Sequence, residues 1–236
     1  MFIHTLATRK QQAEKIHTIV LDFLKNKDIK NFNCLEVGCG TGEIAAYFAD
    51  NVKTMWGIEI NRKLINSPKL HENDKLGYSQ ADGSCLPFHN SVFDLVLLPQ
   101  VYEHTVNQEK MFNEIHRVLK PGGICFFSGP NRFQIIEQHH FLPFLSWLPQ
   151  KLASFYLKIL NKGDVYDIYP RSFWYLNSLT KSFNKYDYTH KMLKYPEKFK
   201  VQERLGPFSF SIFPTWLLKS FSPFYPNFNW ILQKFQ

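Results

Sequence analysis

The sequence predicts an α/β fold: a doubly wound, mostly parallel sheet of seven strands with helices on both faces. Strand-like apolar runs and amphipathic helical segments alternate from residue 33 to residue 129, which is the pattern of repeated strand–helix–strand units. The run FDLVLLP, residues 93–99, is almost continuously apolar, as expected of a parallel strand covered on both faces. Because parallel strands are joined by right-handed crossovers, this alternation places helices on both sides of one sheet.

The first element is a helix over residues 8–27, since its apolar residues recur at helical spacing on one face: Ile16, Ile19, Val20, Phe23 and Leu24. Apolar runs bounded by turn residues predict five strands, at 31–37, 54–60, 76–81, 93–99 and 124–129. Helical periodicity and stop signals predict helices over 42–50, from 61 to near Pro68, and over 107–119 before Pro121-Gly122-Gly123.

The strand–helix rhythm breaks after Pro130. A helix is expected around 171–183, then a strand near 185–193, and an antiparallel seventh strand at 228–235. Between these elements lie two segments rich in aromatic residues and proline, 131–172 and 195–227. We expect one domain over 1–236, with the two segments as insertions.

Composition bounds the class of protein. Of 236 residues 44% are apolar and 20% charged, which excludes global disorder. The net charge of +8 points to phosphates, nucleic acid or an anionic membrane surface. Four scattered cysteines without metal-ligand spacing indicate buried thiols in a reducing compartment. The sequence shows neither an apolar signal-peptide core nor an apolar run long enough to span a bilayer, so a cytoplasmic protein is expected.

The strongest chemical signal is the run LEVGCGTG, residues 35–42, where a strand meets three alternating glycines and then a helix. Glycine suits positions where the backbone turns with positive φ or where a ligand lies against it, although a tight turn without a ligand also explains the run. Glu59 ends the next strand, and its carboxylate can accept two hydrogen bonds from ribose hydroxyls or stand solvated. Glu36 before the loop would repel a pyrophosphate and suits a ligand that carries positive charge.

Five motifs occur together in this order: LEVGCGTGEIA, the acid of GIEI, ADGSCLPF, FDLVLLPQVYEHT and RVLKPGGICFFSGPN. In this the sequence resembles class I S-adenosylmethionine-dependent methyltransferases, and within them the branch with the methyltransferase type 11 domain. The resemblance covers residues 30–131 as a cofactor-binding core. It implies a Rossmann-like methyltransferase fold and S-adenosylmethionine as the cofactor.

The resemblance also implies roles for single residues. Gly38, Gly40 and Gly42 would shape the loop under the methionine moiety, with Cys39 between them, and Glu36 would meet the ammonium group. Glu59 would hold the ribose and Ile60 would pack on the adenine. The remaining positions would contact the adenine amino group or border the methyl group: Asp82, Gly83, Leu98, Pro99 and Gln100. Two positions depart from the family: glutamate replaces the frequent aspartate at 59, and Leu98-Pro99-Gln100 replaces serine-type residues.

Methyl transfer from a sulfonium is an in-line displacement, in which a base is needed only for an acceptor that holds its proton tightly. Candidate bases or acceptor-binding groups are His104, His139 and His140, although packing or capping also explains His104. No metal ion is expected, because the adjacent His139 and His140 diverge and Glu137 with His140 offers only two ligands. A base-flipping tetrapeptide of the DPPY type is absent at 99–102, which argues against methylation of nucleobases.

The two insertions, 131–172 and 195–227, should converge over the acceptor side of the cofactor as a lid, because both leave the carboxyl edge of the sheet. Ordinary hydrophobic packing and an interfacial membrane patch are the other interpretations of their aromatic content. The run HHFLPFLSWLP, residues 139–149, resembles segments of methyltransferases from surface-polysaccharide and lipid pathways. The sequence therefore predicts methylation of a small-molecule, lipid-like or glycan-pathway acceptor, with peripheral membrane contact as a further expectation. An RNA methyltransferase and a non-catalytic cofactor-binding module are the other hypotheses.

Overall fold

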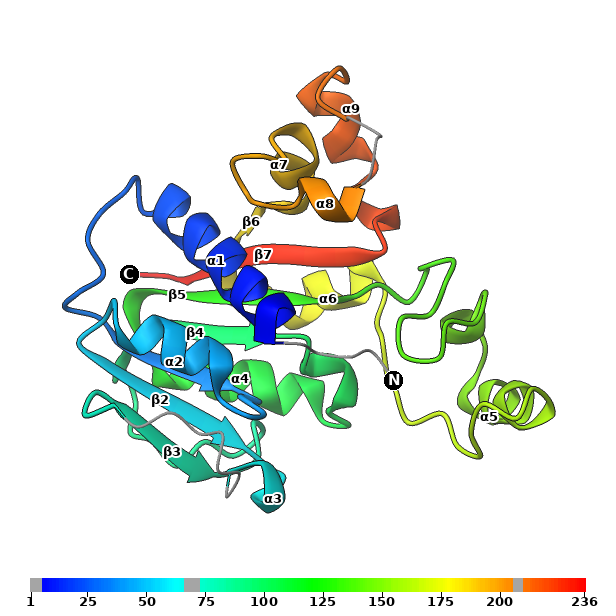
Figure 1. Ribbon diagram of the computed structural model, residues 1–236, viewed down its shortest axis with the longest axis horizontal. Coiled ribbons are helices and arrows are strands. Elements are labelled where there is room, and N and C mark those ends of the chain that lie inside the picture. Colours follow the sequence, from blue (N-terminus) through cyan, green and yellow to red (C-terminus); the bar gives the residue numbers. More distant parts are fainter. Residues whose placement is uncertain (1–5, 66–72, 206–209) are drawn as a thin grey trace.

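The computed structural model describes residues 6–65, 73–205 and 210–236, which build a seven-stranded sheet flanked by helices (Figure 1). The strand order is β3-β2-β1-β4-β5-β7-β6, and β7 runs antiparallel to both of its neighbours. The strands are β1 Asn33–Val37, β2 Thr54–Glu59, β3 Leu76–Gln80, β4 Phe93–Pro99, β5 Leu119–Pro130, β6 Phe183–Asp187 and β7 Asn227–Lys234. The predicted doubly wound, mostly parallel sheet is thus confirmed.

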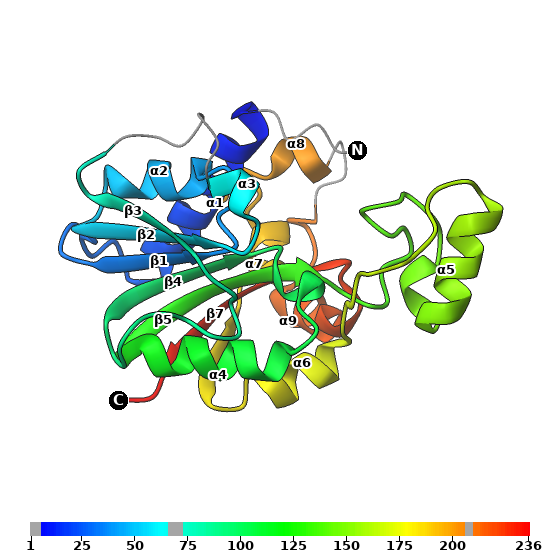
Figure 2. The same ribbon diagram turned by 90° about the horizontal axis from the view of Figure 1, so that it is seen from below.

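Helices cover both faces of this sheet (Figure 2). On one face lie α1 Leu6–Phe23 and α2 Glu43–Ala49, and on the other lie α4 Gln108–Val118 and α6 Phe173–Leu179. The strand order reverses between β1 and β4. From β1 the chain adds β2 and β3 on one side, and from β4 it adds β5 on the other side. In open α/β sheets ligands bind beyond the carboxyl ends of the strands at such a switch point.

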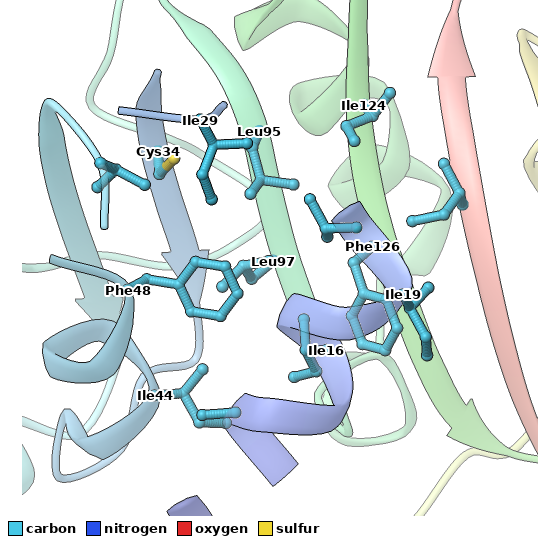
Figure 3. Close-up of a cluster of buried hydrophobic side chains, with 14 of the residues drawn as sticks. Ile16, Ile19, Ile29, Cys34, Ile44, Phe48, Leu95, Leu97, Ile124 and Phe126 are labelled. Atoms are coloured by element: carbon cyan, nitrogen blue, oxygen red, sulfur yellow. The ribbon is translucent and has the colours of Figure 1, made fainter. Parts of the chain in front are cut away.

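Successive side chains of each strand point to opposite faces of the sheet, so the protein has one hydrophobic core on each face. Leu95 and Leu97 of β4 face α1 and α2, whereas Val96 and Leu98 face α4. Figure 3 shows the first core, in which Phe48 of α2 and Ile16 of α1 close over the sheet. Burial on both faces explains why these strands read as continuous apolar runs.

One predicted strand is wrong over its last six residues, 188–193. Residues 185–193 were expected to form a strand, but β6 ends at Asp187 and α7 Thr189–Lys194 follows. The carboxylate of Asp187 accepts a hydrogen bond from the Thr189 amide at 2.8 Å, which helps to begin the helix. Tyr188 and Met192, one helical turn apart, are buried in the core beside α1, so tertiary packing overrides the strand pattern.

Other expected boundaries differ less. β5 begins at Leu119, so Pro121-Gly122-Gly123 lies inside the strand, at the register shift between the Phe93–Leu119 and Leu95–Ile124 pairs, rather than between helix and strand. After β2 comes α3 Arg62–Ile65, and its expected end near Pro68 lies outside the described residues. Cys34, Cys39 and Cys125 are buried as predicted, but Cys85 is exposed.

The segment 131–172 forms a lobe that stands away from the sheet beyond the carboxyl end of β5 (Figures 1 and 2). It contains the 3-10 turn η2 Leu145–Trp147 and α5 Gln150–Ile159, and it has a small core of its own around Leu145 and Leu157. Among the described helices, none combines the length and hydropathy needed to cross a membrane.

The segment 195–227 divides into two parts. Its first part packs on the body of the protein, because Phe199 and Val201 are buried in the core beside α1. Its second part returns to the carboxyl edge through α9 Thr215–Ser220 and the 3-10 turn η3 Ser222–Phe224, after the short α8 Gln202–Leu205. Among the described residues of this segment, those of the second part lie at the edge where a lid is expected.

Candidate functional site at the carboxyl edge of the sheet

The glycine loop between β1 and α2 turns through three left-handed residues. The φ angles are 70° at Gly38, 56° at Gly40 and 83° at Gly42, a region that side chains rarely adopt. A Cβ built on Gly38 would lie 2.5 Å from a methyl group of Val101, so protein packing accounts for this glycine. A Cβ on Gly40 would meet nothing within 4 Å, so the backbone there faces open space and protein packing does not account for this glycine.

Glu59 connects this loop to the ends of the neighbouring strands. One of its carboxylate oxygens accepts from the Gly40 amide at 3.1 Å, and the other accepts from the Asn61 amide at 2.9 Å. Its carbonyl accepts from the Ala81 amide at 3.2 Å. The ends of β1, β2 and β3 are therefore held together, and lone pairs remain on the carboxylate for further donors.

The predicted adenine-binding residues lie at the same edge. The Ile60 side chain is 64% exposed directly after β2, so its surface is available for a planar ring. One carboxylate oxygen of Asp82 accepts from the Ser84 amide at 2.7 Å, which is the geometry of a turn former. A Cβ on Gly83 would lie 2.9 Å from Val37, so close packing also explains this glycine. The contacts of these residues with a cofactor remain predictions.

Glu36 supplies a buried carboxylate beneath the loop. Its side chain is 1% exposed, and burial raises the pKa of the carboxyl to about 8, while the positive charge of Arg9 acts in the opposite direction. The Ala45 amide donates a hydrogen bond to the group, but its Oε2 atom has no partner among the described residues. A buried oxygen without a partner fits the ammonium group that the predicted cofactor carries. The neighbouring Cys39 is buried, and its amide donates to the Ile58 carbonyl at 2.9 Å.

The end of β4 is largely buried. Leu98 and Pro99 are buried, and the Leu98 side chain packs in the core on the α4 side of the sheet, so its contact with the transferred methyl group remains a prediction. Gln100 adopts a left-handed φ of 57°, which is strained for a residue with a side chain. Its amide donates to the Ser128 carbonyl at 2.8 Å, and its side-chain nitrogen lies 3.1 Å from Oδ1 of Asn227.

The three histidines separate into two groups. His104, in the 3-10 turn η1 Tyr102–His104, lies edge-on to His139 of the lobe, with ring centroids 5.1 Å apart. His140 turns away from both, and its Nδ1 lies 3.1 Å from the carboxylate of Glu137. The predicted divergence of His139 and His140 is thus observed.

A fully buried glutamate, which the sequence analysis did not single out, completes the first group. Oε1 of Glu103 lies 4.0 Å from Nε2 of His139. Burial raises the pKa of the Glu103 carboxyl to about 8, and the charge of Glu137 adds to this. Burial and the adjacent His139 lower the pKa of His104, which favours its neutral form. No periodic signal in YEHT distinguishes a buried Glu103 from a solvated one, because the lobe that covers it lies far along the chain.

Comparison with known proteins agrees with this geometry. Residues 35–127 match the model of a family described as methyltransferase domain. A ubiquinone biosynthesis O-methyltransferase of Rickettsia typhi is 29% identical over 154 residues, and a sterol 4-C-methyltransferase of Caenorhabditis elegans is 33% identical over 119 residues. The first match covers 61% of this chain and the second 48%, and the chain spans 61% and 35% of these relatives.

A solved S-adenosylmethionine-dependent methyltransferase of Mesorhizobium loti shares the fold, with a TM-score of 0.58 and 13% identity over 93% of this chain and 98% of that one. The segment that matches the family model, residues 35–127, begins in β1 and ends in β5, so it contains the glycine loop, Glu59 and the end of β4. The sheet, the loop and the matched segment together show that residues 35–127 form a methyltransferase domain and that the chain has the fold of a solved S-adenosylmethionine-dependent methyltransferase.

Proposed function

We propose that the protein transfers the methyl group of S-adenosylmethionine to a small-molecule acceptor of lipid-like character. The observation that supports this proposal most strongly is a row of aromatic rings at the carboxyl edge of the sheet, here called the aromatic ladder. The aromatic ladder connects the two insertions. Its members are Phe144, Trp147, Phe133, Trp174 and Phe224.

Successive rings of this aromatic ladder lie in edge contact. The centroid distances are 5.1 Å from Phe144 to Trp147 and 5.6 Å from Trp147 to Phe133. They are 6.3 Å from Phe133 to Trp174 and 6.3 Å from Trp174 to Phe224. Phe133 follows the end of β5 and Phe224 precedes the start of β7, so these rings lie at the carboxyl edge of the sheet, the edge at which ligands bind in such folds.

Exposure of the ladder favours an extended apolar ligand. Trp174 is 55% exposed and Phe224 is 61% exposed, and contiguous exposed aromatic surface in a folded protein commonly marks a binding site. The names of the two relatives, which refer to ubiquinone biosynthesis and to a sterol, support the same class of acceptor. In this proposal the segment 131–172 and the second part of 195–227 serve as the acceptor lid.

Residues of the loop and strand ends would hold the donor. The carboxylate of Glu36 would receive the ammonium group, the open backbone of Gly40 would lie against the methionine moiety, and Glu59 would take the ribose hydroxyls. The bound donor supplies a methyl group on a sulfonium, so positioning and exclusion of water are the main tasks of the protein. On the acceptor side, His104 and His139 are the groups placed to accept a proton, whereas His140 is engaged with Glu137.

The test is incubation of the protein with methyl-labelled donor and separated lipid, metabolite and RNA fractions of cells. Label in the lipid fraction is the expected result. Label in RNA, with binding that falls steeply as salt rises, would overturn the proposal in favour of an RNA methyltransferase, which the net charge of +8 would suit. Cofactor binding without label in any fraction would identify a non-catalytic module.

We further propose that the lobe touches a membrane surface from which the acceptor is taken. Leu152, Phe155 and Ile159 are exposed on one face of α5, and Phe155 is 62% exposed. Lys151 and Lys158 lie on the same helix, and no acidic residue occurs between Glu137 and Asp164. An exposed apolar face beside lysines suits the interface of an anionic bilayer.

Sedimentation with phosphatidylglycerol vesicles tests this contact. The protein should sediment with them, should be partly released by salt, and should sediment less with neutral phosphatidylcholine vesicles. Phe155→Ser should weaken the association. Phe235→Ala should not, because this exposed ring follows the last residue of β7, whereas the lobe lies at the edge of the sheet where β7 begins. Equal sedimentation of both variants would contradict a contact through α5.

A further inference from the structure

A second cluster of polar groups lies between the turn after β4 and the lobe. It consists of Glu103, His104 and His139, whose ligand atoms all lie within 4.8 Å of one another. Glu103 and His104 come from η1, and His139 comes from the lobe, which is held to the turn by a hydrogen bond of 2.7 Å from the Tyr169 amide to the Glu103 carbonyl.

The carboxylate of Glu103 is the unusual member of this cluster. It is fully buried, and neither of its oxygens accepts a hydrogen bond from another described residue. A buried carboxylate without partners is costly, and proteins keep such groups where they bind an ion or a ligand. The two imidazoles beside it are exposed, so the cluster is closed at the carboxylate and open toward solvent.

We propose that Glu103, His104 and His139 bind one divalent transition-metal ion of the zinc type. Two imidazole nitrogens and one carboxylate oxygen suit zinc, manganese or iron, whereas calcium and magnesium prefer oxygen ligands alone. Ligand atoms about 2.1 Å from one ion lie roughly 3–4 Å apart, so the cluster has to contract by about 1 Å through rotation of the exposed imidazoles.

Three protein ligands leave at least one coordination position for water or for an acceptor oxygen. The ion would therefore orient a hydroxyl-bearing acceptor and lower the pKa of its hydroxyl, a role that rests on the proposed methyl transfer. With both imidazoles bound to the ion, the hydroxyl proton would pass to solvent, whereas in the metal-free protein His104 or His139 would accept it. Binding of the ion itself does not rest on it. The ion would also connect the lobe to the turn after β4, two segments that are distant in sequence.

Calorimetric titration of the metal-free protein with Zn²⁺ tests the site. One ion should bind per chain, the thermal midpoint should rise, and Co²⁺ in its place should give the visible absorption of a protein-bound ion. His139→Ala and Glu103→Gln should each lower the affinity for Zn²⁺ more than about tenfold. His89→Ala, which removes an exposed imidazole outside the cluster, should leave it unchanged.

The proposal is overturned if the wild-type protein binds no Zn²⁺, or if the two cluster variants bind it as the wild type does. It is also overturned if His89→Ala weakens binding as much as they do, because the ion would then be held adventitiously at the surface. Circular dichroism and donor affinity show whether each variant is folded. If Glu103→Gln fails to fold, His139→Ala still tests the site, because His139 is exposed and its loss should not disturb the core. Methyl transfer without Zn²⁺ binding refutes the metal site alone, and Zn²⁺ binding without methyl transfer refutes the proposed function alone.

Discussion

Glu36→Gln gives the sharpest test of the cofactor site, because it removes a buried charge and keeps the shape of the side chain. With a pKa of about 8, the carboxyl of Glu36 is about nine-tenths protonated at pH 7 in the ligand-free protein. An ammonium group favours the ionised carboxylate, so binding of the donor must remove this proton. The affinity for S-adenosylmethionine should therefore rise about tenfold from pH 6 to pH 7.

The glutamine variant should lose this pH dependence. A charge-assisted hydrogen bond contributes about 1.5–3 kcal/mol, and ionising the glutamate at pH 7.5 costs about 0.8 kcal/mol, which reduces this contribution to about 0.7–2.2 kcal/mol. The affinity of the variant at pH 7.5 should accordingly be about 3- to 40-fold lower than that of the wild type. Isothermal titration calorimetry at several pH values measures both effects.

Stability gives an independent readout with a defined sign. The pKa of Glu36 is raised in the folded protein, so folding takes up a proton between the ordinary value of 4.5 and about 8. The stability that this group contributes is present at low pH and is lost as pH rises through that window, by about 3 kcal/mol at pH 7. The thermal midpoint of Glu36→Gln should therefore fall less steeply from pH 5 to pH 8.

Glu43→Gln is the matched control, since Glu43 lies beside the same loop and accepts a hydrogen bond from Thr41 at 2.7 Å. It should change the pH dependence of binding little. The reasoning is refuted if the wild-type affinity is flat between pH 6 and pH 7, or if Glu36→Gln keeps the wild-type slope.

Three further predictions concern the loop, the ribose site and the lid. Gly40→Val should abolish donor binding and leave the far-ultraviolet circular dichroism unchanged, because its side chain would enter open space at a cost of about 1–2 kcal/mol in backbone strain; retained binding would mean that the loop is only a turn. Glu59→Ala should lower donor affinity roughly 10- to 150-fold by calorimetry, and an unchanged affinity would remove Glu59 from the site. Trp174→Ala should reduce acceptor turnover while the thermal midpoint and donor affinity stay near the wild-type values, since the ring is mostly exposed; Phe235→Ala serves as the control, and a fall in midpoint alone would make the ladder structural.

The parallel sheet and the cofactor loop could be predicted because their signals are local. An apolar run such as 93–99 records burial on both faces, and alternating glycines record backbone angles that other residues avoid. The acid at Glu59 could be placed for the same reason, since the carboxyl ends of parallel strands meet at one edge. The strand predicted at 185–193 was wrong beyond Asp187, because packing of Tyr188 and Met192 against α1 decides the conformation there.

The sequence by itself determined the fold class, the place of the glycine loop and the residues at the strand ends, because each depends on neighbours along the chain. Tertiary structure alone decided which of the remaining polar groups meet. It buried Glu103, brought His139 of the lobe to His104, and turned His140 toward Glu137. It also placed Leu98 in the core and aligned Phe133, Trp174 and Phe224 into one ladder. These contacts join segments tens of residues apart, and their formation depends on how the lobe packs against the sheet, which no local pattern of residues records.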